Sequence, residues 1–200
     1  MNAMVDLTQT PDWSKLPVPV DDGAADHLAG LRVPSIPLPA TDGRSVNLGT
    51  ERGLVIVYAY PRTGVPDKPN PDGWDAIPGA RGCSPQSCAF RDHFADLKAL
   101  GVTAVYGLST QDTAYQREAA DRLRLPFPLL SDARLTLTKA LRLPTFDVAG
   151  MVLLKRLTLV LRDGRVEKTF YPVFPPDRNA DEVASWLSGH DAGNITSNAS

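Results

Sequence analysis

The chain of 200 residues has only two cysteines and three histidines, and it has no excess of basic residues. So few sulfur and imidazole ligands disfavour a structural zinc site, which needs such ligands in closely spaced pairs, and we expect neither a metal ion nor a cofactor. The formal net charge is −2. Because no basic stripe is present to bind phosphate groups, we expect no nucleic-acid partner. No apolar run has the length of a membrane span, so we expect no membrane partner.

Residues 1–15 lack both the basic start and the apolar centre of a secretory signal peptide. This absence predicts a cytoplasmic protein. Disulfides rarely persist in the reducing cytoplasm, where cysteines are more often catalytic than structural. The two cysteines are therefore the first residues to consider for chemistry.

The order of the predicted elements indicates one folded domain with two tails. Residues 1–30 read as an N-terminal extension, residues 31–188 as the domain and residues 189–200 as a flexible tail. Apolar patterns and turn residues predict, in chain order, a hairpin over 36–48, a strand over 54–60, a helix ending near 100, a strand over 102–108, a helix from 109 or 110 to 123, a strand over 127–130, a helix over 133–141, a hairpin over 157–171 and a helix over 180–187. This alternation predicts an α/β, thioredoxin-like fold, in which a mixed central sheet carries helices on both faces and an N-terminal β-hairpin is added.

The segment 61–82 makes an unusually long connection between the first long strand and the next helix. Prolines and glycines throughout it exclude a helix and discourage a strand, and Trp74 and Ile77 are its apolar anchors. Long ordered loops are often functional. We therefore interpret this segment as an inserted active-site loop, although a tolerated surface insertion would have the same composition.

Both cysteines lie near the predicted start of the helix that follows this segment. Ser84 and Pro85 suit the N-cap and the first helical position, which leaves Cys83 just outside the helix and Cys88 within it. A helix N-terminus carries partial positive charge and free N–H groups that favour a thiolate, and the neighbouring Arg81 adds positive charge. A reactive thiol is one interpretation of this arrangement, and a pair of small buried hydrophobic residues is the other.

The spacing of Cys83 and Cys88 argues against a permanent disulfide. Within one helix, residues at this separation differ in direction by about 140° and in height by about 7.5 Å. A disulfide requires Cα atoms about 4.4–6.8 Å apart. The two thiols could therefore bond only after the first turn of the helix unwinds, as in a redox cycle.

Four motifs in the chain are similar to those of a known family. They are Tyr60-Pro61 at the end of a strand, Gly-Cys-x4-Cys-x-Phe-Arg-Asp at 82–92, Phe-Pro-Leu-Leu-Ser-Asp at 127–132, and Arg-x-Thr at 156–158. Through them, residues 33–187 resemble the peroxiredoxins of the alkyl hydroperoxide reductase/thiol-specific antioxidant family, and most closely the bacterioferritin-comigratory, or Q-type, subgroup. The cysteine motif is the specific one.

The resemblance implies a thiol-dependent peroxidase that reduces hydrogen peroxide or organic hydroperoxides. By position, Cys83 would be the peroxidatic cysteine, which is oxidised to a sulfenic acid, and Cys88 would be the resolving cysteine, which forms an intramolecular disulfide with it. Arg156 would hold the peroxide oxygens and favour the thiolate, and Pro61 would shield the site. The family also implies thioredoxin or a glutaredoxin-type protein as the reductant, and a monomer or a dimer.

One departure from the family concerns a hydroxyl group. The family has threonine or serine three residues before the peroxidatic cysteine, where this chain has Ala80. Thr63, close after Pro61, is the first candidate to replace that hydroxyl, with the rest of the inserted segment looped out beyond it. Ser84 is the second candidate, and Arg81 would compensate in part by its charge.

Two other functions on the same fold stay open at this stage. A thiol–disulfide oxidoreductase normally has its cysteines in a closer Cys-x-x-Cys motif, and the wider spacing here disfavours that function. A non-catalytic redox-sensing module is compatible with the missing threonine and with the long proline-rich segment.

Overall fold

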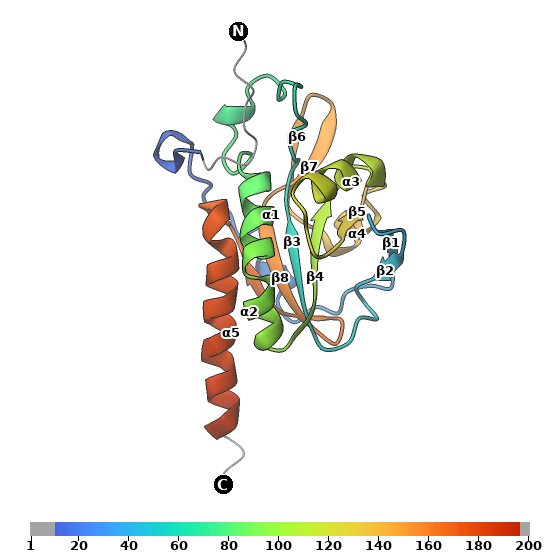
Figure 1. Cartoon of the computed structure of the whole chain (residues 1–200), viewed down its shortest axis with the longest axis vertical. Coiled ribbons are helices and arrows are strands. Elements are labelled where there is room, and N and C mark those ends of the chain that lie inside the picture. The colour runs from blue at the N-terminus through green and yellow to red at the C-terminus, as the bar shows by residue number, and fades with distance from the viewer. Residues whose placement is uncertain (1–10, 197–200) are drawn as a thin grey trace.

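The structure is a computed structural model that describes residues 11–196, with side chains described for residues 11–190. Its centre is a five-stranded sheet made of β3 (Leu54–Ala59), β4 (Val102–Ser109), β5 (Leu129–Ser131), β8 (Leu157–Arg162) and β9 (Arg165–Phe170). The strand order is β5-β4-β3-β8-β9 (Figure 1). β3, β4 and β5 are parallel, whereas β8 is antiparallel to both of its neighbours. The sheet is therefore mixed, as predicted.

The central strand β3 is buried along its whole length. A continuous apolar run such as Leu-Val-Ile-Val-Tyr-Ala is typical of a strand that is covered on both faces. The predicted strands over 54–60, 102–108 and 127–130 are all present, with small differences at their ends.

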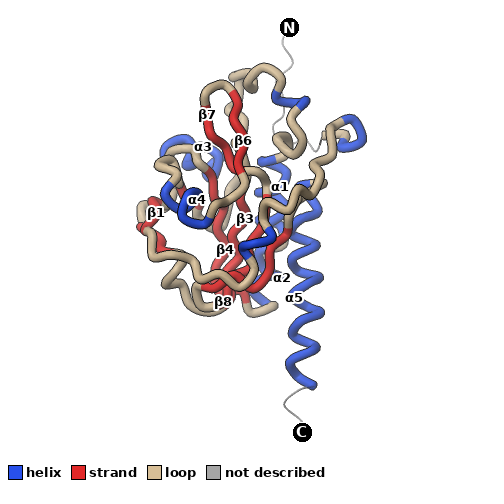
Figure 2. The backbone as a smooth tube through the Cα atoms, turned by 180° about the vertical axis from the view of Figure 1, so that it is seen from behind, coloured by secondary structure: helices blue, strands red, loops and turns tan. Residues whose placement is uncertain are grey.

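Four helices cover one face of the sheet: α1 (Cys83–Asp92), α2 (Phe94–Ala99), α3 (Thr113–Arg122) and α5 (Asn179–Thr196). The core on this face joins Ile56 and Tyr58 of the sheet to Phe90, Leu97 and Val183 of the helices. α5 runs alongside α1 and α2 (Figures 1 and 2).

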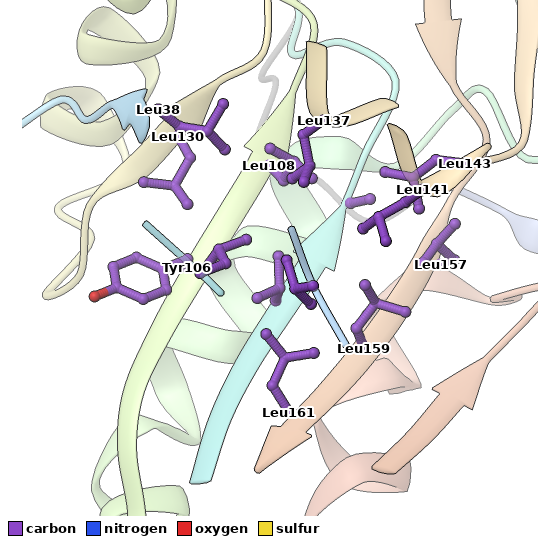
Figure 3. Packing of buried hydrophobic residues seen from close by; sticks show 14 of the residues in the cluster. Leu38, Tyr106, Leu108, Leu130, Leu137, Leu141, Leu143, Leu157, Leu159 and Leu161 are labelled. Atoms are coloured by element: carbon purple, nitrogen blue, oxygen red, sulfur yellow. The ribbon is translucent and has the colours of Figure 1, made fainter. Parts of the chain in front are cut away.

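The opposite face is covered by α4 (Thr136–Leu141) and by the hairpin of β1 (Pro37–Pro39) and β2 (Ser45–Asn47). Leucines fill the space between these elements and the sheet, among them Leu38, Leu108, Leu137, Leu141 and Leu159 (Figure 3). The structure thus confirms the N-terminal hairpin and the helices on both faces of the sheet.

Two predicted helix boundaries near the cysteines are wrong. α1 begins at Cys83 and not after Ser84, because Gly82 takes the N-cap position in the left-handed region, with φ +101°. The expected continuous helix ending near residue 100 is divided at His93 into α1 and α2, since this residue departs from helical geometry with φ −92° and ψ 5°.

The last helix was predicted to end at Leu187, but α5 continues to Thr196. Part of the predicted tail, 189–200, is therefore helical, and residues 197–200 lie outside the described residues.

The sequence analysis missed a second hairpin, made of β6 (Thr145–Val148) and β7 (Met151–Leu154), which projects beyond the sheet (Figure 2). Leu153 of this hairpin packs with Trp74 and Ala80 of the segment 61–82, and Ile77 packs against the same cluster. Trp74 and Ile77 are therefore apolar anchors, as predicted. Contrary to the prediction, the segment does contain a short 3-10 helix, η3 (Trp74–Ala76).

The N-terminal residues contain two short 3-10 helices, η1 (Trp13–Lys15) and η2 (Asp26–Leu28). Leu28 is fully buried in the core under β1 and β2. Between the two turns, Asp22 accepts hydrogen bonds from Lys155 Nζ at 2.6 Å and from Tyr171 Oη at 2.7 Å. Of the helices described, none is both long and apolar enough to cross a membrane.

Candidate active site

The candidate site lies at the end of the sheet where β3 stops and β8 starts. These strands are antiparallel, and their register pairs Ala59 with Leu157. Pro61, just after β3, and Arg156, just before β8, therefore lie at the same edge of the sheet. Because α1 packs over this end of the sheet, Cys83 joins them there.

Cys83 is the first residue of α1 and is buried, with only 4% of its surface exposed. The backbone N–H groups of a first helical turn have no partners within the helix and carry partial positive charge, which favours an anion at this position. A cysteine at a helix N-terminus was predicted, but the structure places Cys83 within the first turn and not just outside it.

Arg156 makes the closest polar contact with Cys83. Its Nη2 donates to Cys83 Sγ at 3.2 Å and also lies 3.2 Å from the Gly79 carbonyl oxygen and 3.1 Å from that of Arg81. The side chain is buried, and in the described part of the chain no carboxylate pairs with it. A buried cation without an anionic partner is costly, so the site favours a negative charge on Cys83 or on a bound substrate.

A buried polar chain, which the sequence analysis missed, holds Arg156 in place. Arg156 Nη1 donates to Gln86 Oε1, and Gln86 Nε2 donates to Asn179 Oδ1 at 3.0 Å. Thr158 Oγ1 donates to the same Asn179 oxygen at 2.6 Å. Gln86 follows Cys83 by one helical turn, so the i, i+3 relation within α1 was the signal that could have pointed to it. No sequence signal pointed to Asn179, which comes from α5.

Pro61 and Thr63 are buried, and side chains from the β4–α3 region hold their backbone. Ser109 Oγ donates to the Pro61 carbonyl at 3.0 Å, and Tyr115 Oη donates to the Thr63 carbonyl at 2.7 Å. Burial raises the pKa of Tyr115, so its hydroxyl stays protonated as the donor to Thr63. Thr63 Oγ1 is buried and has no hydrogen-bond partner within the described structure. The hydrogen-bonding capacity of this hydroxyl is therefore unused within the described residues.

Cys88 is half-buried on the same helix, five positions beyond Cys83, and both cysteines are free. Residues so spaced point in different directions, so an intact α1 keeps the two sulfur atoms apart. Burial raises the pKa of Cys88, and the positive charge of Arg91 opposes this effect. A disulfide between these cysteines therefore requires the first turn of α1 to unwind.

Two other candidate residues contribute less than the sequence suggested. Arg81 donates to Asp75, with an N–O distance of 2.6 Å, so its charge is already compensated by a carboxylate. Ser84 is buried beside Cys83, but among the described residues no hydrogen bond joins its hydroxyl to the site. Ala80 offers only its carbonyl oxygen, 3.7 Å from Cys83 Sγ.

A cavity of about 320 Å³ is lined in part by Arg156. Its lining is mainly apolar and comes from residues 18–20, 77–79 and 171–173 together with Phe146 and Lys155. A cavity of about 150 Å³ is already large enough for benzene, so there is room for an organic group beside the guanidinium. No cluster of metal-ligating side chains occurs among residues 11–190, whose side chains are described.

A family model described as Redoxin matches residues 28–184. Peroxiredoxin Q, chloroplastic, of Populus jackii is 30% identical over 159 residues, which are 79% of this chain and 67% of that protein. The protein of the same name from Oryza sativa subsp. japonica is 30% identical over 79% of this chain and 65% of its own length. The chain thus spans about two thirds of the length of these plant relatives.

Solved structures show the same fold. Peroxidoxin BcpB from Mycobacterium tuberculosis is 25% identical, with a TM-score of 0.64 over 80% of this chain and 96% of that one. Peroxiredoxin Q from Xanthomonas campestris is 20% identical, with a TM-score of 0.60 over 88% of this chain and 96% of that one. The predicted thioredoxin-like fold is confirmed by these likenesses. With the family match over most of its length, the chain belongs to the Redoxin family and, within it, to the Q-type peroxiredoxins, which are thiol-dependent peroxidases.

Proposed function

We propose that Cys83 is the peroxidatic residue and that the chain reduces hydrogen peroxide and organic hydroperoxides. The Cys83 thiolate attacks the terminal oxygen of the peroxide, so that an S–O bond forms as the O–O bond breaks. The alcohol or water leaves with a proton, and Cys83 becomes a sulfenic acid. The observation that carries this proposal is the contact of 3.2 Å between Cys83 Sγ and the buried Arg156 guanidinium, which has no carboxylate partner in the described chain.

Arg156 has two roles in this step. Its positive charge stabilises the thiolate, and it stabilises the negative charge that develops on the departing oxygen. Because Gln86 and the carbonyl groups of Gly79 and Arg81 already orient the guanidinium, little reorganisation is needed during the reaction. Pro61, buried at the same edge, excludes water from the reacting atoms. The cavity beside Arg156 supports organic hydroperoxides as well as hydrogen peroxide.

Cys88 is the resolving residue in this proposal. Its thiolate attacks the sulfur of the Cys83 sulfenic acid, the S–S bond forms, and the displaced hydroxide leaves as water. A dithiol protein, thioredoxin or a glutaredoxin-type protein, then reduces the disulfide by thiol exchange. We place this cycle in a reducing compartment, the cytoplasm, and propose a monomer or a dimer with residues 31–188 as the catalytic domain and 61–82 as its inserted loop.

Thr63 supplies the hydroxyl that Ala80 cannot supply. Thr63→Val should lower the second-order rate constant for oxidation of Cys83 by about tenfold, because a hydrogen bond to a charged group is worth about 1.5–3 kcal/mol. Stopped-flow measurement of thiol oxidation gives this rate constant. Thr110→Val is the matched control, since the Thr110 hydroxyl bonds the Val152 carbonyl on the adjoining hairpin. An equal rate for Thr63→Val and the wild-type protein would remove Thr63 from the site.

The test of the whole proposal is rapid mixing of the reduced protein with peroxide, followed by mass spectrometry. The expected result is a second-order reaction that ends in a Cys83–Cys88 disulfide. Slow oxidation in a single stoichiometric event, without turnover by a dithiol protein, would favour a redox sensor. Insulin reduction without peroxide consumption would instead favour a thiol–disulfide oxidoreductase.

A further inference from the structure

The proposed disulfide requires the N-terminal turn of α1 to open, and a residue from the N-terminal segment covers that turn. A Cβ atom at Gly82, the N-cap of α1, would lie 2.7 Å from Trp13 Cη2 and 2.7 Å from Pro176 Cγ. The indole therefore rests directly on the backbone beside Cys83. In Figures 1 and 2 the 3-10 helix η1, which carries Trp13, lies beside the upper ends of α1 and α5.

Trp13 is held in this position by two further contacts. Its Nε1 donates to Asp177 Oδ2 at 3.0 Å, and its ring meets that of Phe174 edge to face with centroids 5.9 Å apart. Phe174 precedes the short 3-10 helix η4 (Pro176–Arg178) and Asp177 lies within it, and η4 leads directly into α5. The indole thus joins the start of α1 to the segment that leads into α5.

The N-terminal strap, which we define as residues 12–22, is also fixed at its other end. Asp22 is bonded to Lys155 and Tyr171 at 2.6 and 2.7 Å. The shift in its pKa is downward, and the Lys155 contact is the main cause. With this anchor in place, Trp13 can leave the turn only if the strap moves as a unit or its own contacts break.

We propose that Trp13 is a positioning residue for the resolving step: it keeps the first turn of α1 folded and so limits the rate at which Cys88 reaches the oxidised Cys83. This inference rests on the proposed peroxidase cycle and adds a control point to it. The free energy of opening the turn includes loss of the Trp13 contact with Gly82, and the contacts with Phe174 and Asp177 keep the indole in place to oppose that opening. A local opening of this kind requires less free energy than global unfolding, and this free energy depends on the contacts that the opening breaks.

The position of Trp13 also decides between two fates of the sulfenic acid. In one, Cys88 displaces hydroxide from Cys83 and forms the disulfide. In the other, a second peroxide transfers its terminal oxygen to the Cys83 sulfenate, which becomes a sulfinate while the O–O bond breaks and the alcohol or water leaves. A folded first turn prolongs the lifetime of the sulfenic acid and favours the second fate at high peroxide concentration.

The experiment compares wild-type protein with Trp13→Ala and Trp13→Phe. Quenched-flow sampling with thiol alkylation and mass spectrometry separates the peroxide-dependent first phase from the peroxide-independent second phase. Trp13→Ala should leave the first phase unchanged, accelerate the second by about tenfold and lower the sulfinate fraction at high peroxide. Trp13→Phe keeps an aromatic ring but loses the hydrogen bond to Asp177. Its rate for the second phase should lie between those of the wild-type protein and Trp13→Ala. An unchanged or slower second phase in Trp13→Ala would overturn the proposal.

Leu28→Ala is the control for a general loss of stability. Leu28 is buried in the core on the opposite face of the sheet, so its truncation should lower the unfolding temperature and leave the second phase unchanged. Hydrogen exchange of the α1 amides in the reduced protein needs no peroxide and so separates this inference from the proposed function. Exchange at residues 83–88 should rise in Trp13→Ala but not in Leu28→Ala, and equal exchange in both variants would contradict the role of Trp13 even if the peroxidase cycle fails.

Discussion

Cys83→Ser should abolish peroxide consumption completely. A serine hydroxyl stays protonated near neutral pH, and neither the N-terminus of α1 nor Arg156 supplies a base that could remove its proton. The fold should survive, because the change is nearly isosteric at a buried position that already contacts polar groups. The measurement is peroxide consumption with a thioredoxin system as the electron source.

Cys88→Ser is the matched control for that variant. It keeps Cys83, Arg156 and the helix N-terminus, so the first oxidation should proceed at the wild-type rate. Without the resolving thiol the protein should consume a single equivalent, after which the sulfenic acid can be trapped by a reagent that reacts with it selectively. Consumption of a single equivalent by Cys83→Ser together with an inactive Cys88→Ser would mean that the two cysteines have exchanged roles.

The sequence was sufficient to predict those elements that are determined by a local sequence pattern. The apolar run of β3 and the Asp-Gly turn between β1 and β2 both carry strong local signals, and both are present in the structure. The cysteine pair was also found from sequence, because its spacing and its place before a helix are local features. The predicted start of α1 was wrong by two residues, since Gly82 replaces Ser84 as the N-cap.

Features that depend on contacts distant in sequence were not predictable in the same way. The β6–β7 hairpin is stabilised by Leu153 against Trp74 and Ala80, residues that lie far earlier in the chain. Asn179 supports Gln86 across 93 positions, and Trp13 reaches Asp177 across 164. Only the packing of α5 and the N-terminal strap against α1 brings these groups together.

The proximity of Arg156 to Cys83 illustrates the difference between motif and geometry. The Arg-x-Thr motif pointed to Arg156 only by resemblance. The structure gives the reason, because the β3–β8 register places the start of β8 at the edge where α1 begins. It also explains why this arginine acts on the thiol and Arg81 does not, since Arg81 is paired with Asp75.

Arg156→Met should lower the rate constant for Cys83 oxidation by about 10²–10³-fold, the range typical for loss of one preorganised group that stabilises transition-state charge. Methionine retains an unbranched chain of similar length but removes the charge and the donors to Cys83 and Gln86. Loss of the guanidinium also leaves the Gln86 oxygen and two backbone carbonyls without donors, so thermal stability should fall as well.

Two further variants separate the charge of Arg156 from its shape. Arg156→Lys restores the charge without the planar fork that contacts Cys83 and Gln86 together, and it should recover only part of the rate. Arg81→Met removes a half-exposed arginine whose ion pair contributes little, and it should react at the wild-type rate. The oxidation rates, measured by stopped flow on folded protein, should therefore rank Arg81→Met above Arg156→Lys and Arg156→Lys above Arg156→Met. If folded Arg156→Met were oxidised as fast as Arg81→Met, the buried cation would have no part in the reaction, and the helix N-terminus alone would have to activate Cys83.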